Sequence, residues 1–184
     1  MATELSICNS ALIKLGAEPI TALTDLNKRA KLCASQYPIL KEKLLNEHPW
    51  NFAIAREVLV ANSTAPAFGY SNSFDLPTDY IRALDADNGD TDYQREGEQL
   101  LANSDSIELR FILSVDEDEF TNSFAEALAF ELAHDLSYSL VQSQDMRERL
   151  EAAAERSLAK ARSFDAQEGT PREFTDQSFL NVRL

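Results

Sequence analysis

Four segments of the chain repeat apolar residues at alternating intervals of three and four, which is the spacing of one helix face. They cover about residues 3–16, 25–47, 123–140 and 143–164. Few residues separate the third segment from the fourth, so those two helices are expected to pack antiparallel. The stripes consist of Leu5, Cys8, Leu12 and Leu15; Ala30, Cys33, Tyr37, Leu40 and Leu44; Leu128, Leu132, Leu136 and Leu140; and Met146, Leu150, Ala154, Leu158 and Ala161.

Polar residues that can bind free backbone N–H groups predict where these helices begin. Pro38 lies inside the second stripe, where it removes a backbone donor and crowds the preceding turn. It therefore predicts either a kink or two abutting helices. The expected N-caps are Thr3 for the first helix, Thr24 or Asp25 for the second, Ser123 for the third, and Ser143 or Asp145 for the fourth.

Residues 70–115 lose the helical period and predict a small antiparallel β insert. In residues 107–114, apolar side chains alternate with more polar ones, which is typical of a strand with one solvent-facing side. Asn88-Gly89 and Glu96-Gly97 predict tight turns. Pro77 favours an extended approach to a strand at Tyr80. Residues 53–70 are interpreted as an apolar stretch that passes into a loop.

These patterns predict a mainly α fold: a four-helix bundle with a small antiparallel β insert between helices two and three, and an extended C-terminal tail. Residues 1–52 would supply the first two helices, and residues 53–118 the loop and β insert. Residues 119–168 would supply the last two helices, and 169–184 the tail, all in one structural unit. Trp50 and Phe52 are expected to plug the end of the bundle, and with Pro77 they would specify the fold.

The last segment, GTPREFTDQSFLNVRL, follows a stop signal for the fourth helix. Gly169 and Pro171 predict a helix break that acts as a hinge. Two interpretations remain for the apolar residues that follow. They could fold back over the helices, or they could form a strap that docks on a partner. These residues are Phe174, Phe179, Leu180, Val182 and Leu184.

The net charge of −14 is concentrated in the middle of the chain. Residues 61–120 carry 3 basic and 14 acidic side chains, whereas residues 1–60 carry 7 and 6. Such a segment does not favour a surface that grips nucleic acid, because phosphate binding needs clustered Lys and Arg. It would instead repel passing DNA. Its members include Asp85, Asp87, Asp90, Asp92, Asp116, Glu117, Asp118 and Glu119, of which the run 116–119 is interpreted as a solvated turn.

No pattern for catalysis, a cofactor or a metal ion emerges from the sequence. Cys8 and Cys33 are expected to be reduced core thiols of a protein made in a cytosol. His134 is interpreted as an ordinary helical histidine. Neither a signal peptide nor a membrane span is expected from the hydropathy pattern. A carboxylate pair for glycoside hydrolysis would require one member with a raised pKa, and the sequence provides no sign of one.

Several stretches, in this order, resemble the head-to-tail adaptor family of tailed bacteriophages, called tail tubular protein A in short-tailed phages. They are ELSICNSALIKLGAEPITALTD, LLNEHPWNFAIAR, FDLPTDYIRAL and FTNSFAEALAFELAHDLSYSLVQS, and together they span roughly residues 4–165. The LGAEPITALTD and HPWNFA pieces are the most specific. Pro38 departs from the family pattern, whose helix at that place is usually uninterrupted.

The resemblance implies a structural protein of the virion, made in the host cytoplasm, with no enzymatic activity and no cofactor. Family members form a ring, typically of twelve copies, that joins the portal protein to a tail or nozzle protein and lets DNA pass through. The C-terminal tail would dock on the portal, and the acidic segment would face the channel or the tail. Two alternatives are a tail-associated polysaccharide hydrolase that uses paired carboxylates and a small helical regulator that binds a partner.

Overall fold

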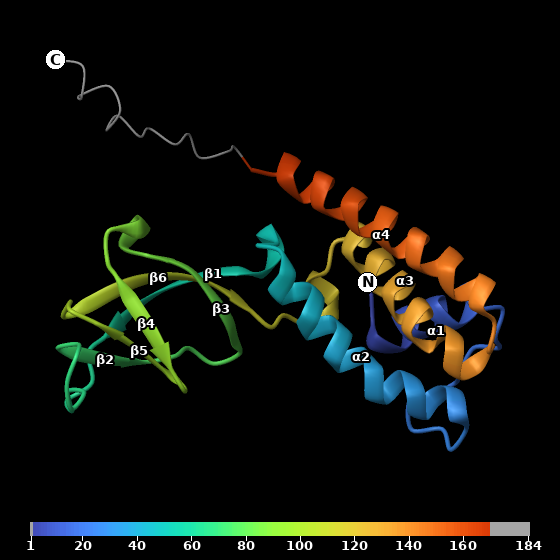
Figure 1. The fold of residues 1–184 in the computed structure, drawn as a ribbon, viewed down its shortest axis with the longest axis horizontal. Helices are drawn as coiled ribbons and strands as arrows, with labels where there is room; N and C mark the ends of the chain where they lie inside the picture. Colours follow the sequence, from blue (N-terminus) through green and yellow to red (C-terminus); the bar gives the residue numbers. More distant parts are fainter. Residues whose placement is uncertain (1, 170–184) are drawn as a thin grey trace, which may run out of the picture.

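The computed structural model describes residues 2–169, which form a helical unit and a β-sandwich at opposite ends of an elongated molecule (Figure 1). Within this range the helices are α1 (Glu4–Lys14), α2 (Lys28–Glu47), α3 (Asn122–Leu140) and α4 (Gln144–Gln167). The strands are β1 (Ile54–Val60), β2 (Asn72–Asp75), β3 (Tyr80–Ala86), β4 (Tyr93–Glu96), β5 (Gln99–Ala102) and β6 (Ser106–Leu113). Three short 3-10 turns lie between them: η1 (Asn51–Ala53), η2 (Asp87–Gly89) and η3 (Glu117–Glu119).

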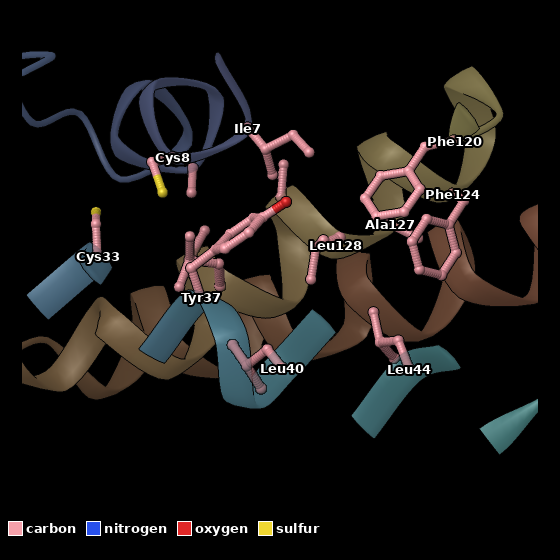
Figure 2. Close-up of a cluster of buried hydrophobic side chains, with 14 of the residues drawn as sticks. Ile7, Cys8, Cys33, Tyr37, Leu40, Leu44, Phe120, Phe124, Ala127 and Leu128 are labelled. Carbon is pink, nitrogen blue, oxygen red and sulfur yellow. The ribbon is translucent and has the colours of Figure 1, made fainter. Parts of the chain in front are cut away.

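The helical unit is built around α3. This helix runs antiparallel to α4 and packs along it, as the short connection predicted, and it also packs against α1 and α2 (Figure 1). Figure 2 shows part of the resulting core, where Tyr37 and Leu44 from α2 meet Phe124 and Leu128 from α3. These are mostly the stripe residues, because the three-four spacing places them on one side of each helix.

The second helix, α2, continues as one helix through Pro38, so the prediction of two abutting helices is wrong. The proline lies on the exposed side of α2. There the carbonyl that loses its helical partner can turn toward water, which makes the interruption tolerable.

The β-sandwich consists of two three-stranded antiparallel sheets, with strand orders β1-β6-β3 and β2-β5-β4. Alternation along β6 directs Leu109 and Phe111 inward, where they pack with Phe74 and Leu100 of the facing sheet. This core is distinct from the helical core. The sandwich therefore has a core of its own, but Ile112 and, in part, Ile81 and Leu84 pack against the helical core on its other side.

The prediction of a mainly α four-helix bundle with a small β insert is wrong. Of the described residues, 49% are helical and 20% lie in strands, which makes this an alpha/beta fold. The stretch interpreted as running into a loop contains β1, an edge strand that pairs with β6 over its whole length. With β1 included, the strands form two sheets that pack around a shared core, rather than hairpins attached to a helical bundle.

Two of the four helix starts differ from the predicted ones. Asp25 instead accepts hydrogen bonds from the N–H groups of Thr21 and Ala22, which closes the turn before α2. The predicted turn at Glu96-Gly97 is confirmed, since it joins β4 to β5. None of the helices within residues 2–169 has the length and apolar character to cross a membrane. The observed N-caps are Thr3, Asn27, Thr121 and Ser143.

Candidate functional site

The chain passes between the helical unit and the sandwich through residues 48–53 and 114–121, and we call these two segments the junction. Trp50 is fully buried there, with its ring centroid 4.9 Å from that of Phe124 and 6.0 Å from that of Phe52. Its Nε1–H donates to the carbonyl oxygen of Leu44 at 2.8 Å, which satisfies the indole's polar atom. Trp50 and Phe52 thus lie over the end of the helical core nearest the sandwich.

Asp165 attaches the end of α4 to the junction. Its side chain is only 5% exposed, and its Oδ1 accepts a hydrogen bond from the backbone N–H of Asn51 at 2.8 Å. Its Oδ2 lies 3.0 Å from Nε2 of His48, and its backbone oxygen accepts from Nδ2 of Asn51 at 2.6 Å. We call this group of three residues the Asp165 latch. It holds the last turn of α4 beside the start of the sandwich.

Glu117 anchors the second junction segment to α2. Its Oε1 accepts hydrogen bonds from Nζ of Lys41 at 2.9 Å and from the hydroxyl of Tyr37 at 3.1 Å. Burial alone would raise the pKa of Glu117, but the Lys41 ammonium, a backbone N–H and the Tyr37 hydroxyl hold it below its ordinary value. The interpretation of residues 116–119 as a solvated turn is therefore wrong for Glu117, which is a paired anchor.

The pKa of Tyr37 is raised, first because the phenol is buried and then because the Glu117 carboxylate lies beside it. Tyr37 therefore stays protonated and keeps donating its hydrogen bond. Lys41 also lies 5.4 Å from the ring centroid of Phe120, so its charge meets an aromatic face as well as a carboxylate.

The acidic residues singled out from the sequence fall into two separate groups. Asp85 lies on β3 in the β1-β6-β3 sheet, and Asp87 begins η2 directly after this strand. Asp90 and Asp92 follow on the exposed turn. Residues 116–119 lie in the junction instead. In the first group, Asp85 pairs with Arg110 at 2.6 Å, and Oδ1 of Asp87 accepts from the backbone N–H of Glu108 at 2.7 Å.

The outer face of the β1-β6-β3 sheet contains a shallow hollow of about 160 Å³. Arg56 of β1 lies directly opposite Arg110 of β6 in the strand register, next to Asp85. Val58, the next outward residue along β1, is 61% exposed. The hollow therefore mixes both signs of charge with apolar surface, a composition suited to polar contacts with another macromolecule more than to enclosing a small ligand.

Pro77 and Gly169, two further residues singled out from the sequence, lie next to regular elements. The backbone oxygen of Pro77 accepts from the N–H of Tyr80 at 3.4 Å, so this proline begins a tight turn that leads into β3. Gly169 is the second residue after α4 and lies close to Asn51. The remaining hinge and docking residues lie outside the described part of the chain: Pro171, Phe174, Phe179, Leu180, Val182 and Leu184.

The residues that hold the junction together were not identified from the sequence. Asp165 is more than a hundred positions away from both His48 and Asn51, and Glu117 is 76 positions away from Lys41. A buried aspartate near a helix end produces no periodic signal that could have revealed it. Residues 2–169 contain no cluster of three or more His, Cys, Asp or Glu side chains arranged to hold a metal ion.

No protein-family model matches the sequence. No curated protein matches it significantly either.

Proposed function

We propose that this chain is a head-to-tail adaptor of a tailed bacteriophage, a structural protein of the virion. Twelve copies would form a ring beneath the portal protein and join it to a tail or nozzle protein, with DNA passing through the centre. The protein would be made in the host cytoplasm, act in the virion, and need neither a cofactor nor a membrane.

One observation carries this proposal: the stretches that resemble the adaptor family coincide with the connections that set the shape of the molecule. HPWNFA, residues 48–53, is the first junction segment. FDLPTDYIRAL, residues 74–84, runs from β2 through the Pro77 turn into β3, which touches α2. LGAEPITALTD, residues 15–25, joins α1 to α2. The two most specific pieces of the resemblance thus lie in connections between elements, which suggests a shared arrangement of helical body and β unit.

The charge of the sandwich supports the proposed passage of DNA. Residues 54–113 carry 4 basic and 11 acidic side chains, a net charge of −7. Such a surface repels phosphate, so DNA could move past it without being retained. Asp90 and Asp92 would contribute directly, because both are exposed.

The position of the Asp165 latch supports the proposed role of the C-terminal tail. The latch fixes the end of α4 at the junction, so the described chain reaches Gly169 at a defined point between the two units. We propose that Phe174, Phe179, Leu180, Val182 and Leu184 enter apolar grooves on the portal. Of the two interpretations of the tail, the proposal therefore adopts the docking strap, and not a tail that folds back over the chain's own helices.

Electron microscopy of this protein mixed with the portal protein encoded near it tests the proposal. Rings that cap the portal are expected. A saturating mixture without capped portals contradicts the adaptor function, as would turnover of a capsule polysaccharide by the purified chain.

Deleting residues 172–184 tests the docking strap separately. Portal attachment should be lost, while the helical circular dichroism signal and the thermal midpoint stay unchanged. A double variant, Phe179→Ser with Leu180→Ser, should act like the deletion, and Asp176→Asn in the same segment should attach normally. Loss of folding on deletion would instead show that the tail covers the chain's own core.

A further inference from the structure

The chain contains two cysteines, and the structure brings them together. Cys8 lies on α1 and Cys33 on α2, 25 positions apart, and each has no exposed surface. Figure 2 shows the two sulfur atoms pointing toward each other across the space between the helices. The two thiols are close enough that each shifts the pKa of the other.

This sulfur contact lies where the helical unit has few other connections. α1 packs chiefly against α3 and touches α2 much less. The side chain of Asn9 binds both backbone groups of Ile20, at 2.8 and 3.0 Å, which holds the connection between the two helices in place. These hydrogen bonds thus help to keep α1 and α2 in the arrangement that places the two sulfur atoms opposite each other.

We propose that Cys8 and Cys33 form a redox site, at which a peroxide converts the two thiols into a disulfide that links α1 to α2. Two cysteines on adjacent helices can be bridged when their side chains are directed at each other and the backbones need only a small adjustment. α1 is the N-terminal helix of the described chain and can supply that adjustment by a slight shift over α3.

The chemistry requires one thiol to react first, and the opposite shifts of the two pKa values select Cys33. The neighbouring Cys8 thiol lowers the pKa of Cys33, although burial opposes this effect. The Cys33 sulfur and, after it, burial raise the pKa of Cys8, so Cys8 keeps its proton. The pair therefore has a defined attacking sulfur and a defined resolving sulfur.

The reaction balances with hydrogen peroxide as the oxidant. The Cys33 thiolate attacks one peroxide oxygen, an S–O bond forms, the O–O bond breaks, and the departing hydroxide takes a proton to become water. The Cys8 sulfur then attacks the sulfur of the resulting sulfenic acid, the S–O bond breaks, and a second water leaves with the Cys8 proton. Two thiols are oxidised and one peroxide is reduced to two waters. Because both thiols are buried, the oxidant reaches them during local opening of α1.

A disulfide at this site would restrain the segment from Cys8 to Cys33 and hold α1 against α2. A protein that folds in a reducing cytosol and later leaves it would lack the disulfide during folding and form it afterwards. That timing rests on the proposed virion function, but the chemistry of the pair does not.

Thiol counting on the purified full-length chain tests the site. The native protein is treated with hydrogen peroxide, quenched, denatured and reacted with a maleimide, and its intact mass is measured. Untreated protein should take up two maleimides. Treated protein should take up none, lose two hydrogen atoms from the thiols, and yield a linked peptide that contains both Cys8 and Cys33. Oxygen added to methionine is distinguished by mapping the peptides.

Other outcomes overturn the proposal. These are two maleimides taken up after treatment, a cross-link only between chains, or sulfinic acids without a link. Cys8→Ala and Cys33→Ala serve as controls and should form no intrachain link. Wild-type protein should also melt at a higher temperature after oxidation, with the shift removed by dithiothreitol. The test needs no portal, so its failure leaves the adaptor proposal standing, and absence of portal rings does not affect it.

Discussion

Replacing Asp165 with alanine should weaken the connection between α4 and the junction. The substitution removes the acceptor of the Asn51 backbone N–H at 2.8 Å and the partner of His48 at 3.0 Å. The bond from the Asn51 side chain to the backbone oxygen of residue 165 can persist. Asp165 is only 5% exposed, so water can replace the lost carboxylate only in part.

The expected cost follows from these contacts. Hydrogen bonds to a charged group contribute about 1.5–3 kcal/mol each, and a buried donor left without a partner costs about 1–3 kcal/mol. Alanine is a better helix former than aspartate by about 0.5 kcal/mol, which offsets part of the loss. The free energy of unfolding should therefore fall by about 2–4 kcal/mol for Asp165→Ala. Asp165→Asn keeps an acceptor for the Asn51 N–H and should lose about 1–2 kcal/mol.

Urea unfolding at pH 7 measures this loss with two probes. Far-UV circular dichroism follows the helices. Fluorescence follows Trp50, the only tryptophan of the chain, whose ring centroid lies 4.6 Å from that of His48 in the latch. With a slope of about 2 kcal/mol per molar urea, the midpoint for Asp165→Ala should fall by about 1–2 M.

Glu155→Ala is the matched control, because Glu155 is an exposed carboxylate on the same helix and no hydrogen bond of the latch involves it. Its midpoint should stay close to that of the wild type. If Asp165→Ala and Glu155→Ala have the same midpoint, the latch contributes nothing to stability and the assignment is wrong. If Asp165→Asn lowers the free energy of unfolding as much as Asp165→Ala does, the hydrogen-bond acceptor that asparagine retains does not stabilise the fold.

Two further predictions concern the junction and the turn before β3. The pKa of Glu117 is lower in the folded than in the unfolded chain, so its stabilisation is complete above its ordinary pKa of 4.5 and is lost as pH falls through the folded value. Urea unfolding is measured from pH 7 to 3, and the midpoints of wild type and Glu117→Gln should converge below about pH 4.5. Glu119→Gln serves as the exposed control. A difference between the wild-type and Glu117→Gln midpoints that stays constant over this pH range contradicts the argument. Asp79 has φ +59°, so Asp79→Ala should lose about 1 kcal/mol in urea unfolding while Asp79→Gly loses less. Equal losses would remove backbone strain as the cause.

The elements that could be predicted are those whose buried face can be recognised from the residues of the element alone. The stripes of all four helices and the alternation of β6 are of this kind, and each is found where its period indicated. β1 is different, because Val58, Leu59 and Val60 are consecutive apolar residues of which only Leu59 points into the sandwich. The outward valines hide the alternation, so only pairing with β6 identifies the strand.

The same reasoning explains why the junction could not be derived from local pattern. Trp50 and Phe52 stand out by residue type, and aromatic side chains at a helix exit indicate packing without knowledge of the partner. Asp165 and Glu117 have no such mark, because a charged residue is buried only if a specific partner reaches it, and these partners come from distant segments. Long-range polar contacts are set by how the units dock. The Asp165 substitution therefore tests docking itself, since it leaves every apolar stripe of the helices unchanged.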